Sequence, residues 1–299
     1  MVCWNFSIQN AKISENYSNL VYFSSLLPER CPKTFGGLKE VLDRYGVEYR
    51  LLQGTKDIWV RDFMPVPVFS GHLVGFTYNP DYLRDDPKYK DTITDGNEVA
   101  RAAGISFSSG LSGIVVDGGN FIRCGGKFIM TSKVFEENPW AQVSYLSRII
   151  EAYLCGQLVV LPWDSNETYG HADGICRMVD DDTVLMTNYS QLDRKVAARF
   201  RNILEHNFKK VHELHFDVPK LDKNSWAYIN WLQTDEVLVL PKFNIPEDDQ
   251  ALRQISKLMP SYNGRIEMVD ATDLIRYEGC LNCCSWVVEK DNTLIDTSI

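Results

Sequence analysis

Amphipathic helices recur along this chain at a regular interval. In five segments, apolar residues stand three and four positions apart, which places them on one face of a helix. These segments are 38–45, 95–103, 143–153, 196–204 and 251–258. Their starts fall roughly every 50 to 60 residues, the interval at which a repeat architecture is to be suspected. The interval therefore favours a chain built from repeated modules.

Short apolar runs rich in branched and aromatic residues lie between the helices. They are 49–52, 72–76, 113–116, 128–130, 158–161, 183–186 and 236–240. Glycine, aspartate and asparagine punctuate these runs, as expected between strands. The order of helix, strand and strand, repeated about five times, predicts a mixed α/β fold.

Two ordinary α/β domains would also accommodate this order, because the repeated units share no sequence identity. However, no linker, low-complexity tract or block of like charge divides the chain. We therefore expect residues 1–299 to form a single domain of repeated modules.

The charge balance excludes one class of partner. Forty acidic residues against 31 basic ones give a formal net charge of -9 and a pI near 5.1. Sequence-independent nucleic-acid binding relies on clustered lysine and arginine, so we expect no nucleic-acid partner. An acidic surface mildly favours a cationic substrate.

The sequence also bears on location. The first residues lack a basic stretch followed by an apolar one, so no secretory signal is expected. No apolar stretch approaches the ~20 residues that span a bilayer. We expect a cytoplasmic protein without a membrane partner.

Three thiols cluster near the C-terminus, at Cys280, Cys283 and Cys284. An unperturbed thiol with a pKa of about 8.5 is only a few per cent thiolate near pH 7. A catalytic cysteine therefore needs an activator and a binding site. On an extended segment, Cys284 would face away from Cys283.

Other interpretations of these thiols are possible. Cys280 and Cys283 have the spacing of half a zinc site, of a redox pair or of a disulfide that switches activity off. No second Cys-x-x-Cys exists, and the suitably spaced histidines, His212 and His215, lie far upstream. The five remaining cysteines are expected to be small core or surface residues.

Candidate activators lie upstream of the thiols. His171 and Asp173 stand two residues apart, which on an extended strand places both side chains on one face. Asp62 ends an apolar strand, and Asp117 precedes a glycine turn. A thiol, an imidazole and several carboxylates on separate segments suit attack on a cationic carbon.

Together these segments resemble a known family. The motifs are Trp59-Val60-Arg61-Asp62, Asp117-Gly118-Gly119-Asn120, Gly170-His171-Ala172-Asp173 and Gly279-Cys280-Leu281-Asn282-Cys283, with further likeness in 225–231 and 238–241. In order and spacing they resemble the guanidine-modifying superfamily, and most closely the agmatine deiminase and Porphyromonas-type peptidylarginine deiminase family. The resemblance implies a pentein fold, a five-bladed α/β propeller of ββαβ modules with a central active site.

The resemblance also implies a reaction. Cys283 would be the nucleophile, His171 the general acid and base, and Asp62 and Asp173 the clamp on a guanidinium group. Attack, loss of ammonia and hydrolysis of a covalent S-alkylthiouronium would give a ureido product, without a metal or organic cofactor. Agmatine or a related small alkylguanidine is the favoured substrate.

Secondary positions are less specific. The family position matched by Asp117 is commonly glutamate, so this side chain is shorter by one methylene, about 1.3 to 1.5 Å. Asp117 could orient His171, bind substrate or shape its turn.

Asn230 and Asn282 could donate hydrogen bonds near the site or satisfy local backbone groups. Trp59 and Trp231 could line a pocket for an aliphatic chain, although core packing is the simpler role for both.

Several alternatives remain open at this point. Asp62 could pair with Arg61, and the His171 segment could be a simple hydrogen-bonded turn. Arginine or peptidylarginine deimination, amidinotransfer to an amine, a non-catalytic scaffold on the same fold and an unrelated Cys-His hydrolase are all compatible with the motifs. A ring of exposed helices would also offer a surface for a homodimer.

Overall fold

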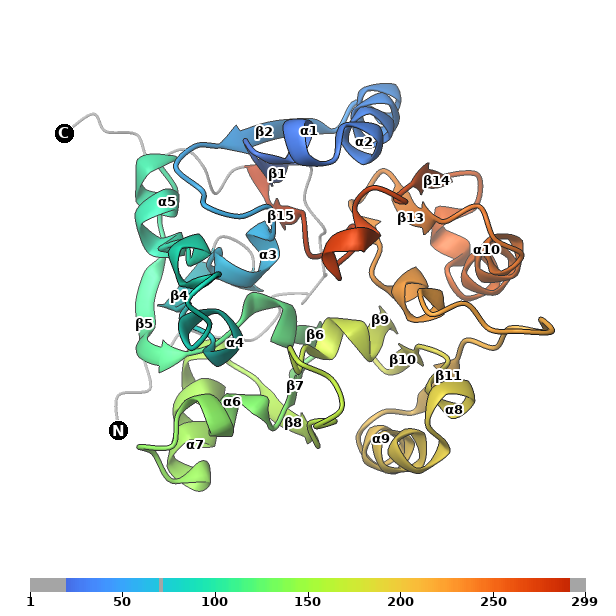
Figure 1. Cartoon of the computed structure of the whole chain (residues 1–299). Coiled ribbons are helices and arrows are strands. Elements are labelled where there is room, and N and C mark those ends of the chain that lie inside the picture. Colours follow the sequence, from blue (N-terminus) through green and yellow to red (C-terminus); the bar gives the residue numbers. More distant parts are fainter. Residues whose placement is uncertain (1–19, 70–71, 291–299) are drawn as a thin grey trace.

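The computed structural model describes residues 20–69 and 72–290. They form five three-stranded sheets arranged around a centre (Figure 1). In every sheet the middle strand pairs antiparallel with one neighbour and parallel with the other. The parallel pair needs a crossover connection, which helices supply.

The strands group by sheet as follows. The sheets are β15 (Trp286–Val288), β1 (Leu20–Ser24) and β2 (Glu48–Leu52); β3 (Val66–Phe69), β4 (His72–Thr77) and β5 (Ser108–Val115); β6 (Ile122–Cys124), β7 (Lys127–Thr131) and β8 (Gln157–Leu161); β9 (Cys176–Asp180), β10 (Thr183–Met186) and β11 (Lys210–Glu213); and β12 (Leu232–Gln233), β13 (Leu238–Lys242) and β14 (Ile266–Asp270).

The crossover helices follow the middle strand of each sheet. They are α1 (Leu27–Arg30) and α2 (Pro32–Tyr45); α4 (Asp81–Arg84) and α5 (Gly96–Ala102); α6 (Lys133–Glu137) and α7 (Val143–Leu154); α8 (Tyr189–Leu192) and α9 (Arg194–Asn207); and α10 (Glu247–Leu258). All five predicted amphipathic helices are present, and the predicted ββαβ modules are confirmed.

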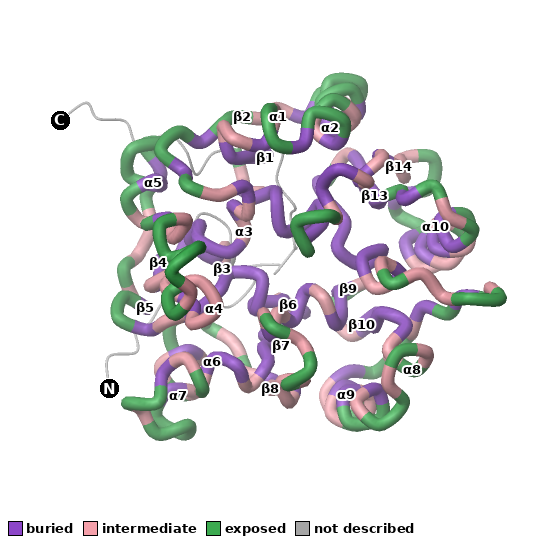
Figure 2. The backbone as a smooth tube through the Cα atoms, in the orientation of Figure 1, coloured by how far each residue is buried: buried purple, intermediate pink, exposed green. Residues whose placement is uncertain are grey.

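The helix α2 illustrates how sequence defines these boundaries. Proline stands at its first position, where a missing N–H costs nothing, and Gly46 ends it in the left-handed conformation with φ 68°. Leu38 and Leu42 are fully buried on one face. The long helices lie at the perimeter with their outer faces exposed (Figure 2). No helix in 20–69 or 72–290 is long and apolar enough to cross a membrane.

The last strand closes the ring on the first. β15 pairs antiparallel with β1, with Trp286 opposite Tyr22 and Val288 opposite Leu20, and the two strands lie together in Figure 1. The Trp286 indole N–H also donates to the Pro65 carbonyl at 2.8 Å, which links the closing strand to the next module.

A short turn precedes the first strand of each module. The turns are α3 (Val60–Phe63), η2 (Gly118–Asn120), η3 (Ala172–Gly174), η4 (Ser225–Ile229) and residues 281–284. The first four contact one another in sequence order. These inner turns are largely buried (Figure 2).

The turns correct three local predictions. Asp62 lies in a helical turn rather than at a strand end, and His171 precedes the turn η3 while Asp173 lies within it, so the two do not share a strand face. Cys284 is not on an extended segment, because its N–H donates to the Cys280 carbonyl at 3.1 Å. In each case the chain must reverse at the centre before it enters a first strand, so a turn replaces the extended geometry.

Candidate active site

Cys283 lies at the centre, in the turn before β15. Its side chain is almost buried, with 7% exposed. Its Sγ lies 3.3 Å from Asn230 Oδ1 and 3.6 Å from Asp173 Oδ2. Burial raises the pKa of the Cys283 thiol well above its ordinary value, and the charges of Asp173 and Asp62 add to the shift. The isolated site therefore holds a protonated thiol.

Two asparagines fix Asp173 against this thiol. Asn282 Nδ2 donates to Asp173 Oδ2 at 2.7 Å, and Asn230 Nδ2 donates to the same oxygen at 3.1 Å. The side-chain amide oxygen of Asn230, Oδ1, in turn accepts hydrogen bonds from the backbone N–H groups of Asn282 and Cys283. Both amides, named from sequence as possible site residues, thus hold the thiol turn against the η3 turn.

Asp62 lies on the opposite side of His171 from Asp117. Its Oδ1 accepts the Gly119 N–H at 3.0 Å and lies 3.7 Å from His171 Nδ1. Burial raises the pKa of Asp62 to about 7, although the charge of His171 opposes this; Asp117 and Asp173 reinforce the rise. A carboxyl with this pKa changes charge in the physiological range.

His171 lies between two carboxylates. Its Nε2 is 2.7 Å from Asp117 Oδ2, on the other side of the ring from Asp62. Burial by itself would lower the pKa of His171, but the charge of Asp62 and the hydrogen bond and charge of Asp117 outweigh it and raise this pKa to about 10. His171 is therefore an imidazolium at neutral pH.

Asp117 has two donors on one oxygen and none on the other. Tyr82 donates its hydroxyl to Asp117 Oδ2 at 2.9 Å, on the same oxygen that contacts His171. Asp117 Oδ1 is buried and has no hydrogen-bond partner. An unsatisfied buried carboxylate oxygen is costly unless a ligand pairs with it. Sequence reasoning missed Tyr82, which no motif includes.

Two arginines also approach the centre. The Arg61 N–H donates to the Cys283 carbonyl at 3.0 Å. Burial and the like charge of Arg177 lower the pKa of the Arg61 guanidinium to about 10. Arg177 lies over the Trp231 ring and donates to the Trp231 carbonyl. In the described part of the chain Arg61 forms no ion pair with Asp62, so the predicted alternative of a local pair is wrong.

The remaining predicted residues have contacts of other kinds. Trp231 is fully buried and donates its indole N–H to Gln233, as a core residue does. The Trp59 ring packs against Gly279, where an added Cβ would lie 2.5 Å from it. Cys280 and Cys284 are fully buried, and burial raises the pKa of both thiols. Neither has a hydrogen bond to a carboxylate side chain among the contacts of the described residues.

The geometry thus gathers complementary groups from separate modules. A thiol, an imidazolium and three carboxylates surround one buried centre. Carboxylates in this arrangement can pair with a planar cation, and a thiol beside them can attack it once its proton is lost. Such a set can perform nucleophilic substitution at a guanidinium carbon.

Solved structures share this fold. The agmatine deiminase of Enterococcus faecalis superposes with a TM-score of 0.68 at 16% identity, covering 92% of this chain and 94% of that one. A dimethylarginine dimethylaminohydrolase superposes with a TM-score of 0.56 at 12% identity, covering 90% and 99%. The protein therefore has the pentein fold, as the motifs predicted.

The sequence comparison identifies the branch. The model of the Porphyromonas-type peptidyl-arginine deiminase family matches residues 30–288, and the chain belongs to this family. The agmatine deiminase of Stutzerimonas stutzeri is 24% identical over 272 residues, covering 77% of this chain and 73% of that enzyme. The chain is accordingly a guanidine-modifying hydrolase of the agmatine deiminase family, and the predicted membership is confirmed.

Proposed function

We propose that this protein is a cysteine-dependent deiminase that hydrolyses the guanidinium group of agmatine or a related small alkylguanidine. The observation that carries the proposal is the contact of 3.6 Å between Cys283 Sγ and Asp173 Oδ2, at a centre where His171 lies between Asp62 and Asp117. The products are ammonia and a ureido compound.

Substrate binding activates the nucleophile. Asp62 and Asp173 accept the N–H groups of the planar guanidinium, and the free Oδ1 of Asp117 offers a further acceptor. The bound cation neutralises the two carboxylates whose charges hold the Cys283 proton. Its arrival therefore lowers the pKa of the thiol, which releases its proton to solvent water, and the thiolate forms beside the carbon that it attacks.

The reaction then needs one proton donor and one proton acceptor. The thiolate forms a C–S bond, and the His171 imidazolium protonates the departing nitrogen, so that ammonia leaves as the C–N bond breaks. The neutral imidazole next takes a proton from water, whose oxygen attacks the S-alkylthiouronium carbon. The C–S bond breaks, the thiolate leaves, and the remaining hydroxyl proton of the adduct passes to solvent water as the ureido product forms. His171 can serve in both steps because its two ring nitrogens face the carboxylates of Asp62 and Asp117, which stabilise its protonated form before the first step and again after the second.

Two observations support a small cationic substrate. Relatives of similar fold and detectable sequence likeness are agmatine deiminases. Near His171, the Tyr169 ring lies 5.9 Å from the imidazole, and its hydroxyl donates to Glu278 Oε2 at 2.5 Å. A carboxylate at this position attracts a substrate whose tail carries a second positive charge.

Ammonia release from a panel of guanidines tests the proposal. The panel contains agmatine, free arginine, a blocked peptidyl arginine, methylated arginine and guanidine. We expect release from agmatine, its loss in Cys283→Ala and its retention in Cys284→Ala, since Cys284 is a neighbouring buried thiol. Circular dichroism checks that both variants fold. Release from Cys283→Ala at the wild-type rate, or silence of the folded, reduced wild type across the panel, would contradict the proposal.

A further inference from the structure

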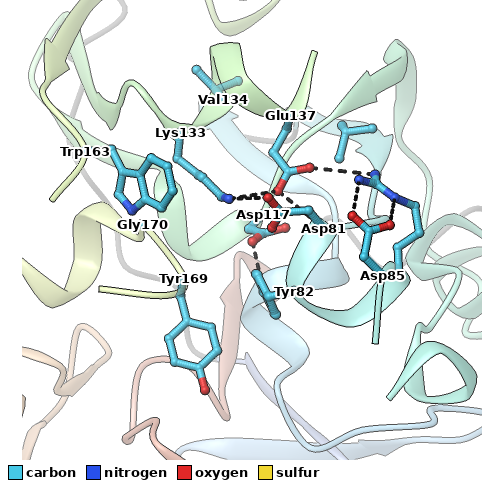
Figure 3. Close-up of polar contacts among 12 residues, drawn as sticks. Asp81, Tyr82, Asp85, Asp117, Lys133, Val134, Glu137, Trp163, Tyr169 and Gly170 are labelled. Carbon is cyan, nitrogen blue, oxygen red and sulfur yellow. Dashed lines mark hydrogen bonds and ion pairs between the residues drawn. The ribbon is translucent and has the colours of Figure 1, made fainter. Parts of the chain in front are cut away.

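Tyr82 is the least expected residue near the catalytic groups. It belongs to α4, a four-residue helix in the connection that follows β4. Its hydroxyl reaches Asp117 Oδ2 at 2.9 Å (Figure 3), and its ring lies 5.0 Å from the Tyr169 ring and 6.3 Å from the His171 ring. A helix of this length has little stability of its own, so other contacts must hold Tyr82 in place.

A buried ion cluster anchors α4. Lys133, with 4% of its surface exposed, places Nζ 2.6 Å from Asp81 Oδ2 and 3.6 Å from Glu137 Oε1 (Figure 3). Glu137 Oε1 also accepts the Asp81 N–H at 3.1 Å. The ammonium lies over the Trp163 ring at 4.4 Å. Because Asp81 directly precedes Tyr82, these contacts fix the start of α4 beside α6.

The same segment holds the two catalytic turns. Thr131, at the end of β7, donates its N–H to Asn120 Oδ1 at 2.8 Å, and its hydroxyl is hydrogen-bonded to the Gly170 carbonyl. Asn120 belongs to the turn after Asp117, and Gly170 precedes His171. The residues 131–137 therefore set the relative positions of Tyr82, Asp117 and His171.

We propose that Tyr82 is a positioning residue for the deimination reaction, acting through Asp117. The Tyr82 hydroxyl and His171 Nε2 both bind the Oδ2 atom of that carboxylate. This orientation leaves Oδ1, which has no hydrogen-bond partner, to face the bound guanidinium. This role rests on the function proposed above. A fixed orientation matters here because the aspartate side chain has a short reach.

The hydroxyl also moderates the pairing of Asp117 with His171. Burial, with the charge of Asp117, raises the pKa of Tyr82 well above its usual value, so the hydroxyl remains a donor. A second donor on Oδ2 draws charge away from the imidazolium. The groups facing His171 are Asp62 from α3, Asp117 before η2, Asp173 in η3 and the two tyrosines. Removing the Tyr82 hydroxyl strengthens the hold of Asp117 on the His171 proton.

Tyr82→Phe and Tyr169→Phe form a matched pair for the test. Both keep an aromatic ring and lose a hydroxyl, but the Tyr169 hydroxyl bonds Glu278 instead of Asp117. The first readout is 15N NMR titration of the His171 imidazole, assigned by its loss in His171→Gln. We expect a higher His171 pKa in Tyr82→Phe and an unchanged one in Tyr169→Phe. An unchanged pKa in Tyr82→Phe, or the same rise in both variants, would overturn the inference.

The second readout is a double-mutant cycle on turnover. A hydroxyl bonded to a charged group contributes enough that Tyr82→Phe should lower kcat/KM about ten- to a hundred-fold. In an Asp117→Asn background the same change should have almost no further effect, since the two residues act as a unit. Additive losses would overturn the inference. The NMR titration needs no substrate, so a silent guanidine panel would count against the proposed function without deciding the role of Tyr82.

Discussion

The protonation states of Asp62 and His171 set the pH range in which the site can work. The pKa of Asp62 is raised to about 7 and that of His171 to about 10, so between these values a carboxylate faces an imidazolium. Below the lower value Asp62 becomes neutral and no longer pairs with a cation. Above the upper value His171 has no proton for the leaving ammonia.

A pH profile of kcat/KM tests this assignment. We expect the value to fall about tenfold per pH unit below the pKa of Asp62 and again above that of His171, because each limb reports an essential group of the free enzyme. Asp62→Asn should lower kcat/KM by about ten- to a hundred-fold, the loss of a hydrogen bond to a charged group. It should also abolish the acidic limb near pH 7. An acidic limb that persists unchanged in Asp62→Asn would assign it to another group.

Only part of this site could be predicted from the sequence. Asp62, His171, Asp173 and Cys283 lie within motifs, and the structure brings them together although Cys283 and Asp173 are 110 positions apart. Tyr82 lies outside every motif, and its partner Asp117 is 35 positions away. Such a contact depends on how two loops pack, and no local pattern of residues records it.

Among the secondary elements, the inner turns determine where the groups of the proposed active site lie. Gly118 and Gly119 permit a close approach between α3 and η2. A Cβ at Gly118 would lie 1.9 Å from the Arg61 carbonyl oxygen, and one at Gly119 would lie 2.6 Å from Asp62 Oδ1. Glycine is required here because the Arg61 backbone and the Asp62 side chain fill the space that any other residue would need.

Gly118→Ala tests this close packing. The Arg61 carbonyl belongs to the backbone and must shift, so we expect a loss of stability of about 1 to 3 kcal/mol and a larger loss of turnover. Gly126→Ala is the matched control, because nothing lies within 4 Å of its added Cβ. Urea unfolding and ammonia release measure both effects. Equal behaviour of the two variants would show that the α3 and η2 turns tolerate separation.

At this scale, the helices were predicted well from the sequence, but the first strand of each module was predicted poorly. The apolar spacing, repeated over several turns, predicts the five amphipathic helices. By contrast, β12 has two residues and β6 and β15 have three each, too few for an alternating pattern. The turns before some of these strands carry the polar site residues, and the segments containing Asp62 and His171 were wrongly predicted to be strands.

For the molecule as a whole, the pairing of β15 with β1 makes the first module depend on both ends of the chain. The first sheet takes two strands from residues 20–52 and one from residues 286–288. The turn that contains Cys283, the proposed nucleophile, leads directly into the closing strand. We therefore propose that residues 1–299 act as one domain, whose closure and whose nucleophile are set by the same segment.

Trp286→Ala tests this dependence. The indole is 1% exposed, lies 5.4 Å from the Tyr22 ring and donates to the Pro65 carbonyl at 2.8 Å. Its truncation leaves a cavity and an unpaired carbonyl, and should lower the free energy of unfolding by about 3 to 5 kcal/mol. Trp140→Ala, at a position 61% exposed, should change it by less than about 0.5 kcal/mol.

The form of the transition decides between one domain and several. If closure couples all modules, far-UV circular dichroism and the His171 NMR signal should be lost at the same urea concentration in Trp286→Ala, both shifted from the wild type. His171 precedes η3 in the fourth module, and η3 contacts the Cys283 turn across the centre, so a coincident shift requires that loss of closure unfold the centre and the outer helices together. If the His171 signal kept its wild-type midpoint while part of the helical signal moved, the first module would unfold independently, and the single-domain proposal would fail.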